Sequence, residues 1–409
     1  MSVRPSRRPV LGGSRRPGSG HSGLGCSTMV EVPLLPDPVV PDYGDACVTR
    51  LVPALLDGPD GPNGWPRWLS TEVGEASQVL LLVLDGLGWN QLQGRSDQAP
   101  VVAGLKGGPI TTVAPTTTAA ALTSISTGVP PGEHGVVGYR IAVGDPGMGA
   151  STEILNALRW TSTIGDARRR HDPRAFQPCS LFGDQWPPVV TRRAFLESGF
   201  TAAHLSDTRL VGYDHRAGLV DSVITAFTAG ESFVYAYWDD IDRTAHEFGL
   251  ADRYDEELAA CDAMVDELLN RLPAGTAVVV TADHGQVHVD ERMLELPGQV
   301  TGLIDGQSGE ARFRWLHARP GAAADLVTEA RNAFSDVAWV RTLDEVAAAG
   351  WLGPVMTGAA RQRLGDVAVV PFEPVAIVDP VEQISIHLIG RHGSLTADEV
   401  LVPALCAVA

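Results

Sequence analysis

Short apolar runs that end in acidic or imidazole side chains recur along the chain. The uninterrupted run Ala277–Val280 is rich in β-branched residues and leads to Asp283 and His284, and Val79–Leu84 leads to Asp85. Such runs are typical of strands buried on both faces, as in a parallel sheet flanked by helices. Open α/β sheets bind their ligands at the carboxyl ends of strands, so these side chains are placed for chemistry. Taken singly, Asp85 and Asp283 fit helix or turn caps equally well.

A third apolar run, Phe233–Trp238, opens onto a polar stretch that contains Asp239, Asp240, Asp242 and His246. Asp242 and His246 are four residues apart, so on one helical turn they point the same way. The three acids repel one another unless a cation or Arg243 lies between them. Alone, the stretch fits a solvated acidic loop; the recurrence of the pattern at three strand ends favours a divalent metal site.

A threonine-rich segment lies between the first two runs. Thr111–Ala114 is predicted to be a short strand, and three threonines after Pro115 precede a helix-forming run, Ala119–Ser126. Thr117 or Thr118 is therefore expected at the helix N-cap, where unpaired backbone N–H groups lie beside a hydroxyl. Such an end can bind an anion, although simple capping would use the threonine equally well.

The remaining pattern predicts an α/β protein with a mostly parallel central sheet and helices on both faces. Arg253–Leu272 is predicted to be an amphipathic helix, and Thr396 with Glu399 resembles a capping box. Residues 29–289 and 371–409 are expected to form the core. Residues 290–370 are expected to form a small inserted cap, with strands at 311–318 and 337–340 and helices at 322–334 and 343–349.

The first 28 residues differ from the rest of the chain in composition. They contain five of the 31 basic residues, no acidic residue and little to bury, so residues 1–28 are predicted to be a disordered basic tail. The rest of the chain contains the other 26 basic residues and all 49 acidic residues. A body this acidic argues against general nucleic-acid binding, and an anionic substrate would need a local positive charge, most simply a bound metal.

Two further features bear on location. No apolar run reaches the ~18 residues of a membrane span, so no membrane partner is expected. The cysteines are odd in number, are scattered along the chain and are never spaced as Cys-x-x-Cys; they are Cys26, Cys47, Cys179, Cys261 and Cys406. This pattern suits reduced thiols in a cytoplasm better than a disulfide framework.

Together with His392 in a late Gly-rich loop, these clusters form an inventory of oxygen and imidazole ligands without thiolate. Such ligands suit one or two zinc ions, with manganese or iron as alternatives. Two metals ~4 Å apart beside a hydroxyl nucleophile suit in-line displacement at phosphorus.

The order and spacing of these motifs resemble the alkaline phosphatase superfamily, most closely its type I phosphodiesterase/nucleotide pyrophosphatase branch, over roughly Leu80 to Leu405. In that branch a threonine nucleophile lies ten residues before the Gly of a Thr-Gly-x-x-Pro turn, and counting back from Gly128 gives Thr118. The resemblance implies two metal sites. One would be held by Asp242, His246 and His392, and the other by Asp85, Asp283, His284 and Thr118.

The same resemblance assigns three further features. His134 looks like the structural histidine of the branch, and Tyr139 aligns with an Asn that holds a non-bridging phosphate oxygen. Where nucleotidases of the branch carry Phe-Pro-Asn-His, this chain has Ala119 to Leu122, and the short Ala side chains predict a differently shaped substrate pocket.

The sequence thus predicts a cytoplasmic hydrolase that binds two divalent ions and cleaves a small phosphoester or phosphoanhydride through a covalent phospho-threonine. The alternatives are a phosphomonoesterase or a phosphonate or sulfate ester hydrolase on the same scaffold. A protein that only binds a phosphorylated ligand, with metals stabilising the fold, is a third alternative. The sequence does not indicate an oligomeric state.

Overall fold

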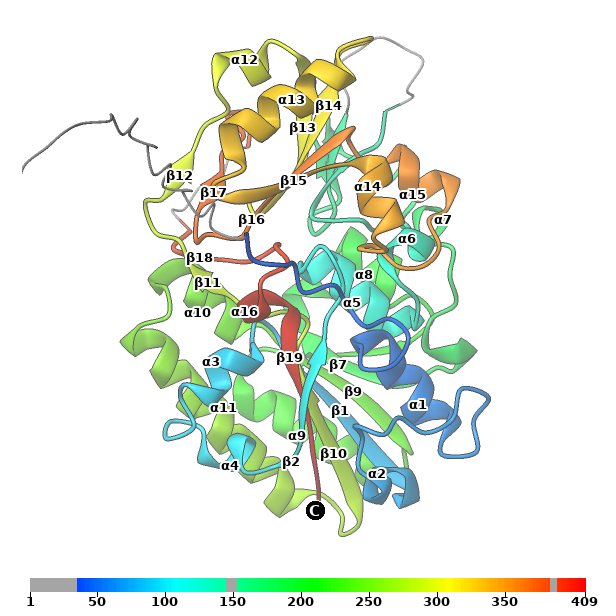
Figure 1. The fold of residues 1–409 in the computed structure, drawn as a ribbon. Helices are drawn as coiled ribbons and strands as arrows, with labels where there is room; N and C mark the ends of the chain where they lie inside the picture. The colour runs from blue at the N-terminus through cyan, green and yellow to red at the C-terminus, as the bar shows by residue number, and fades with distance from the viewer. Residues whose placement is uncertain (1–34, 145–152, 383–387) are drawn as a thin grey trace, which may run out of the picture. The chain divides into compact units, whose positions relative to one another are not determined.

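A mixed seven-stranded sheet lies at the centre of residues 37–409 in the computed structural model, which describes residues 35–144, 153–382 and 388–409. The strand order is β2-β19-β10-β1-β9-β7-β8 (Figure 1). In that order, the strands span Lys106–Thr111, Leu401–Val408, Thr276–Thr281, Gln78–Leu84, Phe233–Trp238, Pro188–Arg192 and Arg209–Tyr213. The predicted tail at residues 1–28, with Cys26, lies outside the described residues.

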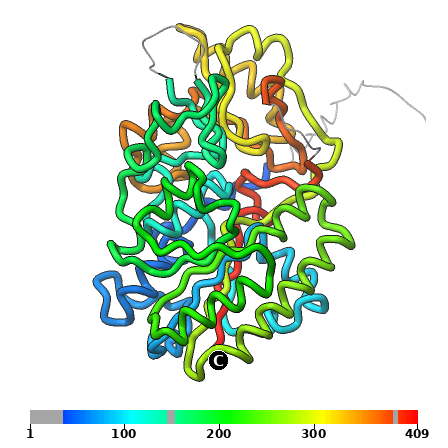
Figure 2. Tube along the Cα trace, turned by 180° about the vertical axis from the view of Figure 1, so that it is seen from behind, coloured from blue at the N-terminus to red at the C-terminus, as the bar shows by residue number. Residues whose placement is uncertain are grey.

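Five neighbouring strands of this sheet, β10, β1, β9, β7 and β8, run parallel. The last strand of the chain, β19, is antiparallel to β10 and β2 and lies among the other strands in both views (Figure 1, Figure 2). The α/β fold with a mostly parallel central sheet is therefore confirmed.

The apolar runs seen in the sequence form the centre of this sheet. β9 and β10 are buried along their whole length, and β1 from its second residue, because helices cover both faces. Leu84 pairs with Trp238, and Val83 pairs with Thr281. This register brings the three predicted strand ends to one edge of the sheet, which is why the polar residues that follow them meet.

Two sets of helices pack on the sheet. α4 (Pro100–Ala103), α9 (Arg216–Thr228) and α10 (Asp240–Phe248) contact α11 (Asp252–Arg271), which was predicted at 253–272. α1 (Leu51–Asp57), α6 (Pro131–His134) and α8 (Gly199–His204) contact α5 (Thr118–Thr127). In Figure 1, α4, α10 and α11 lie to the left of the central strands, and α1 and α5 lie to the right.

A second, four-stranded antiparallel sheet has the order β13-β14-β16-β15. Its strands span Ile304–Glu310, Phe313–Ala318, Val367–Pro371 and Ala338–Thr342, and α13 (Ala323–Phe334) packs against it over a hydrophobic cluster of its own. β14, α13, β15 and α14 (Leu343–Ala348) match the predicted order. β13 and β16 were not predicted; β13 reads IDGQSGE, a polar sequence with low intrinsic strand preference.

The remaining elements are short. The further helices are α2 (Thr71–Glu75), α3 (Trp89–Gln93), α7 (Pro173–Phe176), α12 (Gly298–Thr301), α15 (Gly358–Gln362), α16 (Ala397–Val400) and the 3-10 turns Val48–Arg50, Phe182–Asp184 and Arg193–Phe195. A small sheet joins β3 (Arg140–Ala142), β4 (Ile154–Asn156), β5 (Thr161–Ser162) and β6 (Gly165–Asp166). Two strand pairs complete the set: β11 (Val287–His288) with β18 (Gly390–Arg391), and β12 (Met293–Leu294) with β17 (Ala376–Ile377).

Two local predictions were wrong. The strand predicted at Thr111–Ala114 lies earlier, at Lys106–Thr111, where Gly107, Gly108 and Pro109 hide the strand pattern and backbone pairing with β19 supplies it. The predicted capping box also fails, because the Thr396 side chain makes no capping bond. Instead the Thr396 hydroxyl donates to Glu399 Oε2 at 2.6 Å, and Arg312 holds the same carboxylate. Among the described helices, none is long and apolar enough to cross a membrane.

Candidate metal centre and active site

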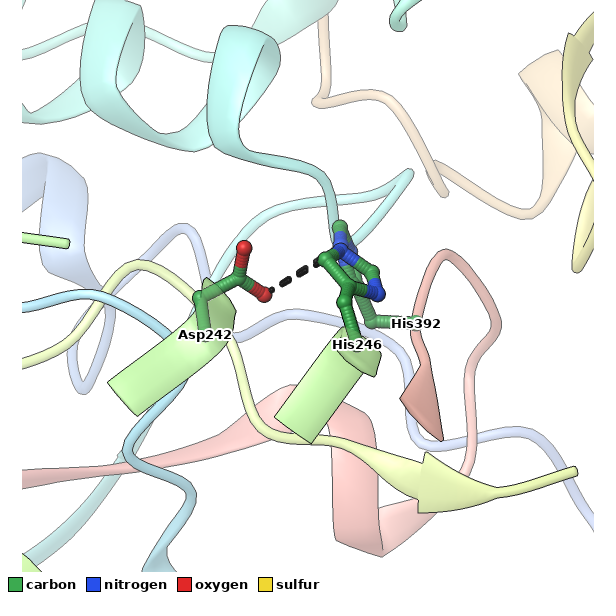
Figure 3. A group of neighbouring side chains, drawn as sticks. All are labelled: Asp242, His246 and His392. Atoms are coloured by element: carbon green, nitrogen blue, oxygen red, sulfur yellow. Dashed lines mark hydrogen bonds and ion pairs between the residues drawn. The ribbon is translucent and has the colours of Figure 1, made fainter. Parts of the chain in front are cut away.

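Three predicted ligands, Asp242, His246 and His392, form what we call the histidine-rich group. Asp242 and His246 lie one turn apart on α10, and His392 follows β18 (Figure 3). Their ligand atoms all lie within 4.8 Å of one another. Asp242 Oδ1 is 3.4 Å from Nε2 of His246 and 3.7 Å from Nε2 of His392. The side chains are mostly buried, with 10–21% of their surface exposed, and all three line a cavity through which a ligand can reach them.

The hydrogen bonds of the two imidazoles define which nitrogen is free. Nδ1 of His246 lies 2.7 Å from the Gly390 carbonyl, and Nδ1 of His392 lies 2.7 Å from the Thr116 carbonyl. Since a carbonyl only accepts, each Nδ1 carries the proton, and the two Nε2 lone pairs face each other at 3.3 Å. Burial, together with His284 and His246, holds the pKa of His392 well below its usual value. Neutral imidazoles with converging lone pairs fit a bound cation.

The second set, Asp85, Asp283 and His284, forms the carboxylate-rich group, and all three residues are buried. Nε2 of His284 lies 3.4 Å from Asp85 Oδ1 and 3.5 Å from Asp283 Oδ2. These two carboxylate oxygens are buried without a hydrogen-bond partner. Burial and the charges of Asp283 and Asp242 raise the pKa of Asp85 well above its usual range, and burial raises the pKa of Asp283. A divalent cation would neutralise these carboxylates and coordinate their unpaired oxygens, so the group fits a metal.

The two groups are neighbours, because the imidazole of His284 stacks on that of His392 with ring centres 3.6 Å apart. Their supporting contacts were not predicted. The Tyr237 hydroxyl donates to Asp85 Oδ2, and Gln286 Nε2 donates to Asp242 Oδ1 at 2.6 Å. In the sequence Tyr237 looks like a core aromatic. Gln286 carried a weak signal, as a polar residue two positions after His284.

Thr118 is the first residue of α5, and Thr117 is the N-cap. The Thr118 hydroxyl lies 3.2 Å from Nε2 of His284, beside the carboxylate-rich group. Thr117 makes no capping bond through its side chain. The Thr116 hydroxyl is occupied, since it accepts from the Gly393 N–H and donates to the Ser394 carbonyl. Among the three adjacent threonines, the geometry therefore favours Thr118 as the hydroxyl available beside the candidate ligands.

The sequence left open whether Asp239 and Asp240 belong to a solvated loop or to a metal site. In the structure both pair with Arg192, a residue that the sequence analysis did not single out. Arg192 binds Asp239 at 2.6 Å and Asp240 at 2.8 Å, and Arg243 also pairs with Asp240. Neither acid belongs to the two ligand groups. The acidic stretch after β9 is thus held by arginines on one side, while Asp242 alone turns toward the histidines.

Two further predicted residues have defined surroundings. His134 is fully buried, and its Nδ1 accepts from the Val136 N–H while Nε2 lies 2.9 Å from the Ser124 hydroxyl. Burial and Arg363 lower the pKa of His134 to about 3, so the imidazole is neutral. The Tyr139 hydroxyl accepts from Asn156 at 2.9 Å.

Two cavities meet at the ligand groups. The first, about 460 Å³, reaches Asp85, Thr118, Asp242 and His246. Its other walls are mainly apolar and aromatic, with Leu122, Leu158, Phe195, Phe200, Leu205, Tyr235 and Tyr237, but they also include Arg159, His204, Asp239 and Arg243. The second, about 240 Å³, reaches Thr118, Tyr139, Asp242, His246 and His392. Of the segment Ala119–Leu122, only Leu122 lines the first cavity, because the three alanines are fully buried in α5.

Several solved structures share the fold. Murine ectonucleotide pyrophosphatase/phosphodiesterase 5 has 16% identity and a TM-score of 0.59, over 80% of this chain and 87% of that one. Phosphonoacetate hydrolase from Sinorhizobium meliloti 1021, solved with phosphonoformate, has 15% identity and a TM-score of 0.61, over 81% of this chain and 90% of that one. No curated protein sequence matches the chain significantly.

The family model for type I phosphodiesterase/nucleotide pyrophosphatase matches residues 79–338, well over half of the chain. This stretch contains β1, the threonine helix α5, and α10 and β10 with the candidate ligands that they position. The match supports a phosphoester hydrolase and agrees with the resemblance stated from the motifs. The chain belongs to the type I phosphodiesterase/nucleotide pyrophosphatase family, within the alkaline phosphatase superfamily.

Proposed function

We propose that the protein is a dinuclear metal-dependent hydrolase of small phosphoesters or phosphoanhydrides that works through a covalent phospho-threonine. The observation that carries the proposal is the pair of buried, unpaired carboxylate oxygens of Asp85 and Asp283 beside the Thr118 hydroxyl. A buried carboxylate oxygen without a hydrogen-bond partner is costly, and a metal ion is the simplest compensation.

Each of the two ligand groups would bind one metal ion. The histidine-rich group would hold one ion, and the carboxylate-rich group with Thr118 would hold the other. When bound, two divalent ions lower the pKa of a nearby hydroxyl and neutralise charge on the phosphoryl and leaving oxygens. Zinc suits these oxygen and imidazole ligands best, with manganese or iron as alternatives.

Thr118 would act as the nucleophile. Its Oγ1 attacks phosphorus as the bond to the leaving oxygen breaks, and that oxygen departs with the electron pair. Water then cleaves the phospho-threonine and regenerates the hydroxyl. The start of α5 supports this role, because its first backbone N–H groups have no intrahelical acceptor and can hold phosphoryl oxygens. We assign Tyr139, which lines the second cavity, to the phosphoryl group as a further contact.

Two similar structures support the reaction class. One form of the murine protein is described as an inactive threonine-to-alanine variant in complex with AMP. The Sinorhizobium meliloti 1021 enzyme is a phosphonoacetate hydrolase, so phosphonate hydrolysis is the second candidate function. We further propose a cytoplasmic protein that acts on a small substrate and binds neither nucleic acid nor membrane. The described cysteines, Cys47, Cys179, Cys261 and Cys406, are all free thiols.

The test is a panel of chromogenic esters assayed with protein loaded with zinc, manganese or iron(II) and with chelator-treated protein. The panel contains 4-nitrophenyl phosphate, bis(4-nitrophenyl) phosphate and 4-nitrophenyl sulfate, with phosphonoacetate assayed separately. We expect metal-dependent cleavage of the phosphodiester. Cleavage of phosphonoacetate alone would favour the second candidate. Equal rates with and without metal, or no cleavage of any compound, would reject the proposal.

A further inference from the structure

The second cavity is lined by Thr118 and the histidine-rich group, and also by three charged residues that the proposed reaction does not use, Glu310, Glu382 and Arg391. Glu382 is already paired with Arg140 and Arg314, which leaves Glu310 and Arg391. Glu310 is the last residue of β13 in the second sheet, and Arg391 is the last residue of β18. Both residues are buried, with 6% and 7% of their surface exposed.

Glu310 is held firmly by one oxygen and left unpaired at the other. Oε1 accepts the backbone N–H of Tyr139, while Oε2 is buried with no hydrogen-bond partner. A Cβ added at Gly138 would lie 3.0 Å from Oε1, and one added at Gly393 would lie 3.2 Å from Glu310 Cβ. The backbone before Tyr139 and after His392 is thus closely fitted to this side chain. A carboxylate kept only for stability would be expected to pair both oxygens.

Arg391 shows the complementary feature, since its Nε is also buried without a partner. The neighbouring charged side chains already form ion pairs with one another. Arg312 pairs with Glu399, Arg140 pairs with Asp379, and Glu382 accepts from both Arg140 and Arg314. Among the described residues, Glu310 and Arg391 form no ion pair with each other or with another side chain. The cavity is therefore lined by a carboxylate that has one unpaired oxygen and by a guanidinium that has an unpaired N–H.

The chemistry of this pair selects a class of ligand. An ammonium group would satisfy Glu310 but would be repelled by Arg391, and a second anion would satisfy Arg391 but would be repelled by Glu310. A neutral group with neighbouring hydroxyls satisfies both, because each hydroxyl can donate and accept. Burial raises the pKa of Glu310 to about 7, which suits contact with neutral hydroxyls.

The relative size of the cavities indicates where such a group fits. The second cavity has about half the volume of the first, 240 Å³ against 460 Å³, so it suits the smaller of two substituents. Both cavities reach Thr118, as the two substituents of a phosphodiester would require.

We propose that the second cavity is a subsite for a small hydroxylated substituent of a phosphodiester, recognised by Glu310 and Arg391. The larger, apolar or aromatic substituent would occupy the first cavity. This inference rests on the proposed phosphoester hydrolysis and names its substrate class. Glu310 would act in binding this substituent, and the Thr118 chemistry would be unchanged.

The activity test compares three 4-nitrophenyl phosphodiesters whose second substituent is 2,3-dihydroxypropyl, propyl or 2-aminoethyl. We expect kcat/KM for the dihydroxypropyl ester to exceed that for the propyl ester by about 10- to 100-fold, the usual range for hydrogen bonds to charged groups. Glu310→Gln keeps the size of the side chain but replaces the free acceptor with an amide. It should remove this preference while leaving the propyl ester unaffected. Glu373→Gln, a partly exposed carboxylate on the loop after β16, is the matched control and should leave the preference unchanged.

A binding measurement separates this inference from the proposed function. Calorimetry would compare glycerol 1-phosphate with propyl phosphate on metal-loaded wild-type protein and on Glu310→Gln. Tighter binding of glycerol 1-phosphate to the wild-type protein alone supports the subsite even if no ester is hydrolysed. Equal binding of the two compounds, a preference for the aminoethyl ester, or an equal loss for all three esters in Glu310→Gln would overturn the inference.

Discussion

The two ligand groups differ in burial and in origin. The carboxylate-rich group is fully buried and comes from the ends of β1 and β10, two neighbouring strands of the central sheet. The histidine-rich group is partly exposed and comes from α10 and the loop after β18. Two of its members, Asp242 and His246, line both cavities. The first group is thus part of the core and reaches the first cavity only through Asp85, whereas the second group is part of the wall of both cavities.

This difference predicts different behaviour for two bound ions. An ion in the carboxylate-rich group would neutralise two buried oxygens that have no other partner, so its removal should be costly. An ion in the histidine-rich group would lie beside both cavities, and its ligands would be two imidazoles and one carboxylate. We expect the first ion to exchange slowly and the second to exchange readily.

The largest expected effect concerns Thr118, which touches the carboxylate-rich group through His284. Thr118→Ala should lower turnover on the order of 10³-fold or more, because it removes the nucleophile. The fold and most of the metal should remain, since Thr118 is one of four proposed ligands. Steady-state rates on one active ester, with metal content measured on the same sample, check this.

Two variants serve as controls for Thr118→Ala. Thr118→Ser should keep measurable activity because the hydroxyl remains, and Thr117→Ala should cost far less. If Thr117→Ala is inactive and Thr118→Ala is active, the assignment is off by one residue. If all three variants are active, the covalent mechanism must be abandoned.

The second prediction separates the groups directly. Asp283→Ala should lose the ion of the carboxylate-rich group, and His392→Ala should lose that of the histidine-rich group, each retaining about one ion per chain. Elemental analysis of both variants and their melting temperatures would show the difference. Asp283→Ala should change the melting temperature more than His392→Ala does, because it alters a fully buried set of charges. Loss of both ions in both variants would mean that the groups form a single site.

The third prediction concerns the two hydrogen bonds that support the ligand groups, one from Tyr237 and one from Gln286. Tyr237→Phe removes the hydroxyl that holds Asp85, and Gln286→Leu removes the amide that holds Asp242. Loss of such a contact typically weakens metal binding by about 10- to 100-fold. Each variant should weaken one ion only, as measured by competition with a chelator. Tyr254→Phe and Gln307→Leu, which change buried polar groups outside both ligand sets, should leave the affinities of both ions unchanged.

The smallest effect concerns the second cavity. Burial raises the pKa of Glu310 from 4.5 to about 7, so between these values the unfolded chain releases a proton that the folded protein retains. The contribution of this group to stability is present below pH 4.5 and is lost as the pH rises through 7. Relative to the wild-type protein, Glu310→Gln should therefore gain stability as the pH rises across this window. Denaturant unfolding at pH 5 and pH 8 would reveal this, and an unchanged difference would contradict the burial argument.

The sequence analysis succeeded where structure follows local pattern. β1, β9 and β10 are plain apolar runs, and the ligands that follow them stand next to the strand ends. Thr118 was assigned from the spacing to Gly128 that the family resemblance implies, and its role stays a prediction. β2 and β13 were missed or misplaced because glycines, proline and polar residues hide strands whose pairing is set by tertiary contacts.

The supporting residues could not be predicted for a related reason. Tyr237 and Gln286 act through contacts that only the folded chain creates. Glu310 and Arg391 lie 81 residues apart, on different sheets, and meet only at the second cavity. No local pattern marks such residues, because an exposed and a buried charge look alike in the sequence.

The central claim is that both ligand groups hold divalent ions that the reaction requires. The most direct test is elemental analysis of wild-type protein purified without chelator, with activity followed while the ions are removed stepwise. We predict about two ions per chain, with activity lost when the more exchangeable ion leaves and the fold retained at that point. Full activity in protein that contains no divalent ion would contradict the account.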